Sequence, residues 1–309
     1  MANSFVTAAD LLQLADGNIS DIQVSDLLEE TPLLKAMSSI VASNSTSHEW
    51  LKKTAAPAAG FRAINDGVEN TKATYTKITQ ALKLFDAGFD IDMGLLKAEG
   101  GEALKRREAI DHLIAAFVGM ESQIIYGTDS DAVGFNGFAD LSSVDAVADE
   151  MVVDAGGTTA STASSVWAIR LGESAVSAVY GLGGQIEIGQ EYSVLRSGSV
   201  TGSYDAMRTP ILFYGGLQVA TNYDLGRIAN VTEDAGKGLT DDLLSELIGK
   251  FPAGRAPSVI AMSRRSLRQL QQSRTATNPT GAPAPFPSDA FGIQLIATDQ
   301  ISDTEAILT

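Results

Sequence analysis

The side chains that most often do chemistry in enzymes are scarce in this chain. It has no cysteine and only two histidines, His48 and His112, among 309 residues. Thiolate nucleophiles, thiolate metal sites and disulfides are therefore excluded, and a serine–histidine hydrolase would depend on one of two imidazoles. His112 lies beside the apolar stripe of a predicted helix with no ligand partner near it in sequence. A surface or interface histidine is favoured, and a hydrolase that uses His112 stays as the enzymatic alternative.

Three short motifs approach known binding or catalytic patterns, and each lacks a required residue. Gly181-Leu182-Gly183-Gly184 follows a predicted strand, but the third glycine of a dinucleotide loop is missing and another strand follows. Asp129-Ser130-Asp131 begins like a calcium loop, but Val133 stands at the fifth position and no glutamate closes the loop. Gly198-Ser199-Val200-Thr201-Gly202 has valine where a nucleophile elbow needs serine. We therefore predict no catalytic residue, no cofactor site and no metal site.

One basic cluster remains, formed by Arg264, Arg265, Arg268 and Arg274 in a predicted helix that follows Ser263. At helical spacing Arg264 and Arg268 share a face. A phosphate site on that face stays open as an alternative. A contact between subunits or a solvated helix face is favoured, because the rest of the chain is strongly acidic.

The charge balance also limits the class of partner. The chain has 22 Lys plus Arg against 38 Asp plus Glu, a net charge of −16 and a pI near 4.5. Such a chain repels phosphate as a whole, which disfavours a nucleic-acid-binding domain. With 44% hydrophobic and 19% charged residues it can bury a sizeable core. No apolar run approaches the ~20 residues of a membrane span, and MANSFVTAAD lacks the features of a signal peptide.

The N-terminal third of the sequence contains two segments that have too few apolar residues to form hydrophobic cores of their own. Residues 1–47 contain short amphipathic pieces, one opened by Pro32, and little apolar mass. We predict an arm that packs on something else and serves assembly rather than folding of the subunit. Residues 48–93 have strand character, and the alternating run Thr71–Thr79 lacks an apolar face. We predict a long two-stranded hairpin that projects from the core, with Lys72 and Lys77 available to carboxylates of a neighbouring subunit.

The remaining two thirds predict a mixed body around one long helix. Apolar residues recur at helical spacing from about Glu102 to Tyr126, and Gly127 provides the signal that ends the helix. Strands are predicted at 165–171, 175–180, 209–214, 217–221 and 293–298, and helices at 239–248 and 263–270. Helices and strands alternate without a βαβ rhythm, so the predicted fold class is α+β.

The order of these parts resembles the major capsid proteins of tailed double-stranded DNA phages, which have the Hong Kong 97-type fold. Several sequence motifs of this chain resemble those of the podovirus-like capsid proteins. Ile125-Tyr126-Gly127-Thr128 running into Gly134-Phe135-Asn136-Gly137-Phe138 resembles the junction after their spine helix. Phe213–Val219 followed by Arg227–Val231 resembles their "Gly-Leu-x-Val … Arg-Ile-x-Asn" strands. Ala261–Leu267, a proline-rich loop and Ala297–Ile301 resemble the end of their axial domain.

The resemblance implies an N-terminal arm (1–47), an extended E-loop hairpin (48–93) and a P-domain that carries the spine helix and junction (94–139). Residues 140–309 would form an A-domain interleaved with P-domain strands at about 205–235 and at the C-terminus. The implied function is a capsid protein that assembles with itself as hexamers and pentamers into the icosahedral shell around phage DNA. Candidate contacts between subunits are Lys72, Lys77, Arg264, Arg265 and Arg268.

The resemblance also implies partners and a location. We expect a portal, a separate scaffolding protein because no long N-terminal scaffolding extension is seen, a possible decoration protein, and packaged DNA bound without sequence specificity. No cofactor and no membrane contact are expected, and the shell would assemble in the bacterial cytoplasm and form the virion. An encapsulin-type nanocompartment shares the fold and is the alternative shell.

Overall fold

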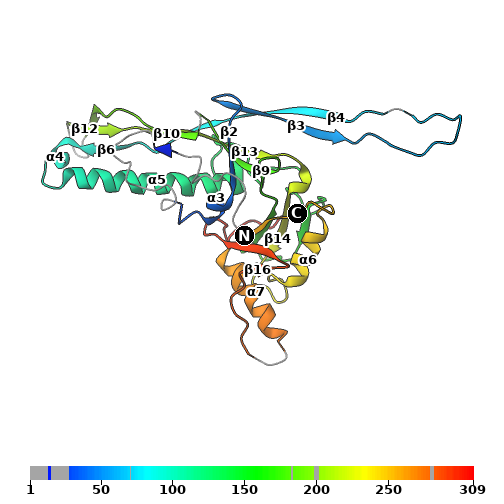
Figure 1. Ribbon diagram of the computed structural model, residues 1–309. Coiled ribbons are helices and arrows are strands. Elements are labelled where there is room, and N and C mark those ends of the chain that lie inside the picture. Colours follow the sequence, from blue (N-terminus) through cyan, green and yellow to red (C-terminus); the bar gives the residue numbers. More distant parts are fainter. Residues whose placement is uncertain (1–12, 15–27, 70, 182–183, 198–201, 279–281) are drawn as a thin grey trace.

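The computed structural model describes residues 13–14, 28–69, 71–181, 184–197, 202–278 and 282–309. Figure 1 shows a mixed α+β molecule with three parts: a long helix lying under a sheet, a body below one end of that helix, and a thin hairpin that extends in the opposite direction. The α+β class is therefore confirmed.

The long helix α5 (Gly101–Tyr126) follows the one-turn helix α4 (Met93–Leu96) and is succeeded by the 3-10 turn η1 (Gly127–Asp129). The prediction of Glu102–Tyr126 is confirmed to within one residue. Gly127 ends the helix with a positive φ of 56°, a conformation that glycine adopts without strain. One face of α5 is fully buried and provides much of the core, through Ala109, Leu113, Ala116, Phe117, Met120, Ile124 and Ile125.

The sheet that covers α5 has six strands, in the order β1-β10-β13-β9-β2, with β5 paired to β13 beyond this path. The central strand β13 contacts α5, and the ring of Phe213 lies 6.5 Å from that of Phe117. The strands are β1 (Gln13–Leu14), β2 (Ser38–Val41), β5 (Lys83–Asp86), β9 (Val176–Tyr180), β10 (Gln185–Ile188) and β13 (Ile211–Val219).

A second six-stranded sheet forms the body, in the order β16-β17-β15-β8-β14-β7. Its three central strands are entirely buried, and most of their residues are apolar. Helices α6 (Asp241–Gly249) and α7 (Arg264–Ala276) and the turn η3 (Asn222–Asp224) complete the body. The strands are β7 (Val152–Asp154), β8 (Ser164–Ile169), β14 (Leu225–Val231), β15 (Val259–Met262), β16 (Asp289–Ala290) and β17 (Ile293–Ala297).

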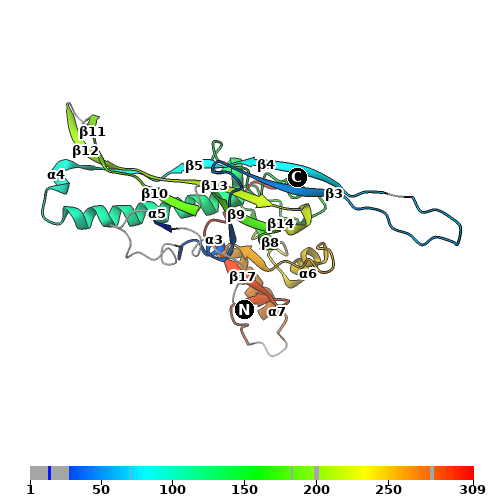
Figure 2. The ribbon, with the colours of Figure 1, turned by 45° about the horizontal axis from the view of Figure 1, so that its top comes forward.

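Two smaller sheets lie at opposite ends of the molecule. At the start of α5, β6 (Phe89–Asp92), β11 (Tyr192–Ser197) and β12 (Ser203–Thr209) form a three-stranded sheet. Figure 2 shows β11 and β12 rising above that end of the helix. At the other end, β3 (Ser47–Ala55) and β4 (Thr74–Ala81) form the antiparallel hairpin that leaves the body.

The prediction that the N-terminal arm is separate from the subunit core is wrong for its last part. Residues 1–12 and 15–27 lie outside the described residues, but α3 (Pro32–Ala36) and β2 belong to the core. Leu28, Leu33, Leu34 and Met37 are fully buried, and β2 pairs in parallel with β9. The apolar mass of this segment is small, but its four fully buried side chains pack into the core of the same subunit.

The hairpin is shorter than the predicted range 48–93, because its last residues belong to other sheets. Lys83–Asp86 pairs with β13 and Phe89–Asp92 pairs with β12. The two strands predicted at 209–214 and 217–221 are one continuous strand, β13. At Gly215 a Cβ atom would lie 2.9 Å from the Met120 side chain, and at Gly216 it would lie 2.5 Å from Leu82. These glycines allow close packing within the strand and do not form a turn.

Candidate assembly surfaces

The β3–β4 hairpin is anchored to the body at its root by a buried histidine. The amide of Ser43 donates to His48 Nδ1 at 3.2 Å, so the other ring nitrogen carries the proton and donates to Gln218 Oε1 at 2.6 Å. The ring also stacks on Trp50, with 5.7 Å between the centroids. Because Gln218 belongs to β13, this contact joins the start of the hairpin to the central strand of the sheet over α5.

Beyond its root the hairpin has few contacts with its own subunit. Lys52 Nζ donates to Asn222 Oδ1 at 2.6 Å, at the turn η3 of the body. Nearer the root, Lys77 forms an ion pair with Glu49 on the opposite strand at 2.6 Å. The hydrogen bond from Lys77 holds the pKa of the Glu49 carboxyl below its usual value. Lys77 is thus already paired inside the hairpin, although 58% of its side chain remains exposed to a neighbour.

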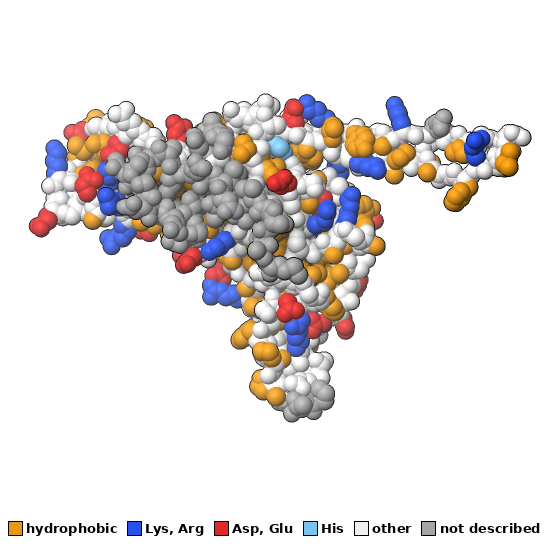
Figure 3. Space-filling view, in the orientation of Figure 1, with side chains coloured by type: hydrophobic (Ala, Val, Ile, Leu, Met, Phe, Trp, Pro, Cys, Tyr) orange, Lys and Arg blue, Asp and Glu red, His pale blue; other side chains and the backbone are white. Residues whose placement is uncertain are grey.

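The tip of the hairpin carries large apolar side chains that are exposed and that no described residue of the subunit covers. Phe61 and Ile64 are 108% and 93% exposed, and Leu51 and Tyr75 on the strands are more than half exposed. Figure 3 shows hydrophobic side chains along this hairpin and at its end. Lys72 is exposed in the same loop, just before β4. Reasoning from the sequence selected the lysines and missed Phe61 and Ile64, although two apolar residues between Gly60 and Asp66-Gly67 were a visible signal.

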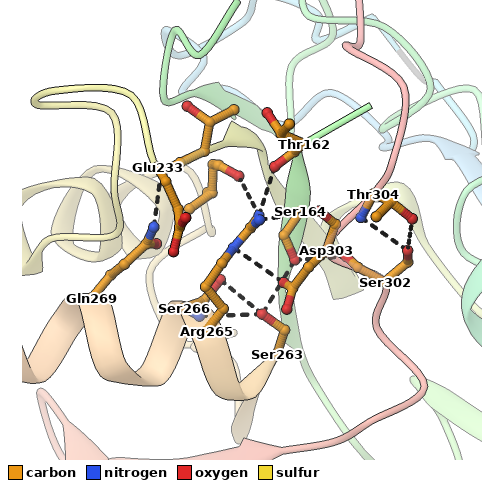
Figure 4. A network of polar contacts seen from close by, with 12 residues as sticks. Thr162, Ser164, Glu233, Ser263, Arg265, Ser266, Gln269, Ser302, Asp303 and Thr304 are labelled. Carbon is orange, nitrogen blue, oxygen red and sulfur yellow. Dashed lines mark hydrogen bonds and ion pairs between the residues drawn. The ribbon is translucent and has the colours of Figure 1, made fainter. Parts of the chain in front are cut away.

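The arginines of α7 have different environments. Arg265 points into the body: it pairs with Asp303 at 3.3 Å and donates to the carbonyl oxygens of Thr162 and Val231 at 2.8 and 3.1 Å (Figure 4). Only 13% of its side chain is exposed. Its guanidinium therefore ties α7 to the C-terminal segment and to β14, and has little left to offer a neighbouring subunit.

Arg264 and Arg268 lie at the surface of α7, as their spacing predicted. Arg264 pairs with Asp299 and Arg268 pairs with Glu233 at 2.6 Å. Exposed pairs of this kind contribute about 0.2–1 kcal/mol each. Arg274 makes a bidentate contact with Asp241 that links α7 to α6, with distances of 2.7 and 2.8 Å. The structure thus does not gather the four arginines into one anion site.

The junction after α5 is built around the carboxylate of Asp140. It accepts hydrogen bonds from the amides of Thr128 and Gly137, both at 2.9 Å, and from the Thr128 hydroxyl at 2.7 Å. Phe135 and Phe138 are buried, and Phe138 packs on Trp167 of β8. This junction therefore fixes the end of the long helix to the body.

In the part of the chain that the structure describes, no catalytic arrangement surrounds either histidine. The ring of His112 stacks on Phe89, with 5.1 Å between centroids, and His48 has the structural partners given above. Within the described residues, no group of three or more His, Asp or Glu side chains could hold a metal ion. None of the helices in that same part of the chain has the length and apolar character needed to cross a bilayer.

A family model settles the class to which this arrangement belongs. The model of the family "Major capsid protein GP7" matches residues 15–309, nearly the whole chain. The chain belongs to this family of major capsid proteins. No curated protein matches the chain. Membership of this family makes the protein a structural component of the virion capsid and not an enzyme, which excludes the hydrolase alternative.

Solved structures show the same fold. The chain is similar to a bacteriophage Epsilon15 structure at 17% identity, with 87% of each chain covered and a TM-score of 0.63. It is also similar to the bacteriophage JBD30 capsid at 9% identity, with 89% of this chain and 92% of that chain covered and a TM-score of 0.50. The expected Hong Kong 97-type capsid fold is thereby confirmed. The family match, rather than the fold alone, decides for a capsid protein over the encapsulin alternative.

Proposed function

We propose that this capsid protein assembles into hexamers and pentamers that close an icosahedral shell around double-stranded phage DNA. In this proposal the β3–β4 hairpin is the E-loop, which reaches a neighbouring copy. α5 is the P-domain spine, and the body with α6 and α7 is the A-domain around the capsomer axis. The segment from Leu28 onward belongs to the subunit core, so it is left out of the proposed arm.

The observation that carries the proposal is the exposed apolar tip of the hairpin. A two-stranded hairpin alone is marginally stable in water, and this one leaves Phe61 and Ile64 in solvent. Burying the two side chains fully would contribute about 3–6 kcal/mol, at 1.5–3 kcal/mol each. A second copy of this chain is the available partner, because the protein belongs to a family that forms shells.

Charged residues have a supporting role in this proposal. Lys72 and Lys77 would complement carboxylates on the neighbouring copy, whose net charge is −16. Arg264 and Arg268 would contribute at the surface of α7, and Arg265 would act indirectly by fixing α7. The same acidic charge lets the shell enclose DNA without holding it, so no sequence-specific contact with DNA is proposed.

The further partners proposed are a separate scaffolding protein, a portal and a decoration protein, with assembly in the bacterial cytoplasm. Electron microscopy of the protein expressed alone and with its neighbouring gene products tests which of them the shell needs. Shells of uniform diameter only with a co-expressed partner would support the scaffolding role. Uniform closed shells from the protein alone would contradict it.

The hairpin itself is tested by shortening it. Ala55 and Thr74 are paired across the hairpin, so residues 56–73 can be replaced by Asn-Gly, which forms a two-residue turn. We expect the shortened chain to keep its circular dichroism and to form no shells. The double variant Phe61→Ser/Ile64→Ser should show the same loss. Leu195→Ser is the matched control, because Leu195 is 70% exposed on β11 and outside the hairpin. Normal shells from the double variant would contradict the proposed role of the tip.

A further inference from the structure

A single buried carboxylate joins three segments that are far apart in sequence. Glu121 lies on α5, has no solvent exposure, and faces both α3 and the residue that follows β17. Its Oε2 accepts from the Leu34 amide at 2.9 Å, and its Oε1 accepts from the Thr298 hydroxyl. The N-terminal segment, the long helix and the C-terminal strand of the body sheet therefore meet at this one side chain.

Glu121 supplies the hydrogen-bond acceptor that the first turn of α3 lacks in its own sequence. The N-cap residue Thr31 makes no side-chain capping hydrogen bond, and the first turn of α3 contains no acidic residue. The Glu121 carboxylate accepts from the amides of both Leu33 and Leu34 instead. The first turn of α3 is thus satisfied only while residues 28–41 stay docked on α5.

Among the described residues, this carboxylate has no charged partner. Its contacts from α3 are backbone amides, and its contact from the segment after β17 is a hydroxyl. The charged side chains on the elements around it are all exposed at the surface: Glu29, Glu30, Lys35, Arg264 and Asp299. The nearest residues along its own helix face, Phe117, Val118, Ile124 and Ile125, are apolar. Ionising Glu121 in the docked state therefore places a charge at a buried site that offers neutral hydrogen-bond donors but no opposite charge from the described residues.

We propose that Glu121 is a pH-sensitive latch that keeps residues 28–41 docked while its carboxyl is protonated and weakens their docking when it ionises. Release of residues 28–41 would also expose parts of the subunit that they cover. β2 is the edge strand of its sheet, so its departure would free the edge of β9 for another strand. It would also expose Leu28, Leu33, Leu34 and Met37.

The direction of the effect follows from burial, which raises the pKa of Glu121 from 4.5 to about 7 and outweighs the hydrogen bonds that lower it. The docked state thus binds the proton more tightly than the released state, where the carboxyl is in water. Docking is most favourable below about pH 4.5, weakens as the pH rises, and reaches its minimum above about pH 7. With one proton involved, the population of the released state rises about tenfold per pH unit within this range.

Hydrogen exchange of the full-length protein tests the latch. Protection factors, corrected for the intrinsic exchange rate, are measured for peptides covering residues 28–41 between pH 5 and pH 9. We expect protection to fall about 40-fold from pH 5 to pH 7 and then to level off. Peptides of the fully buried strand β14 are the internal reference and should show no such fall.

Two variants separate a latch from a merely structural contact. Glu121→Gln keeps an acceptor for the Leu34 amide and cannot ionise, so the protection of residues 28–41 should no longer depend on pH and should exceed that of the wild type at pH 8. Thr298→Val removes a hydroxyl that stabilises the ionised form, so the levelling-off should move to higher pH. Flat protection in the wild type, or the same pH dependence in Glu121→Gln as in the wild type, would overturn the proposal.

Discussion

Truncation of Phe117 to alanine tests whether the long helix and the sheet above it form one core. Phe117 lies on α5, has no solvent exposure, and packs 6.5 Å from Phe213 of β13. Phe213 in turn stacks on Phe85 of β5, with 5.1 Å between centroids. The substitution therefore removes the ring through which the helix contacts the stacked pair Phe213 and Phe85 in the sheet.

The expected loss is large because the site cannot collapse around the missing ring. Phe→Ala substitutions in cores cost about 3–5 kcal/mol, which combines the lost burial with the cavity left behind. Here the helix on one side and the paired strands β5 and β13 on the other hold the cavity open. We expect a loss in this range, which is a large fraction of the roughly 5–15 kcal/mol that stabilises a typical domain.

Urea unfolding of the unassembled subunit measures this loss. Trp167, which is fully buried in the body, provides a fluorescence signal at a distance from the substitution, on β8 of the other six-stranded sheet. Phe286→Ala is the matched control, because the same group is removed from a side chain that is 69% exposed. It should change the free energy of unfolding by less than about 0.5 kcal/mol. A loss below about 1 kcal/mol for Phe117→Ala, or equal losses for both variants, would refute the packing described here.

Two further predictions concern the N-terminal segment and the hairpin lysines. Deletion of residues 1–41 should destabilise the subunit itself, because it removes four fully buried side chains and strand β2. The measurement is the midpoint of urea unfolding, which should fall. An unchanged midpoint would mean that this segment serves assembly alone. Charge reversal of Lys72 and Lys77 together should reduce the yield of shells without unfolding subunits, and more so at low salt, where exposed charges are least screened. Normal shells at low salt would mean that these lysines are only solvated.

The long helix and the general plan could be read from the sequence because their signals are local. The repeat of Ile110, Leu113, Phe117 and Ile124 at helical spacing and the glycine at 127 placed α5 to within one residue. The helices predicted at 239–248 and 263–270 correspond to α6 and α7, whose caps Thr240 and Ser263 accept hydrogen bonds from amides of the first turn. Such patterns depend on neighbours within a few residues.

The errors concern features that depend on residues far away in sequence. The N-terminal segment contains too few apolar residues for a core of its own, and its sequence therefore predicts that it lies outside the subunit core. Leu33 and Leu34 are nevertheless buried, because α5 supplies their contacts. The strands predicted at 209–214 and 217–221 left out Gly215 and Gly216, but these glycines make room for Met120 and Leu82 inside one strand. Arg265 is one residue from the exposed Arg264, and only the tertiary fold directs it to Asp303 and the carbonyls of the body. Helical spacing alone could not separate these two roles.

The measurement that tests the central claim most directly is a cryo-electron microscopy reconstruction of the shell assembled from the full-length protein. We predict pentamers and hexamers of this chain in which each β3–β4 hairpin lies on a neighbouring copy, with Phe61 and Ile64 buried in that contact. A shell in which both side chains remain in solvent, or in which the hairpin contacts only its own subunit, would contradict the account.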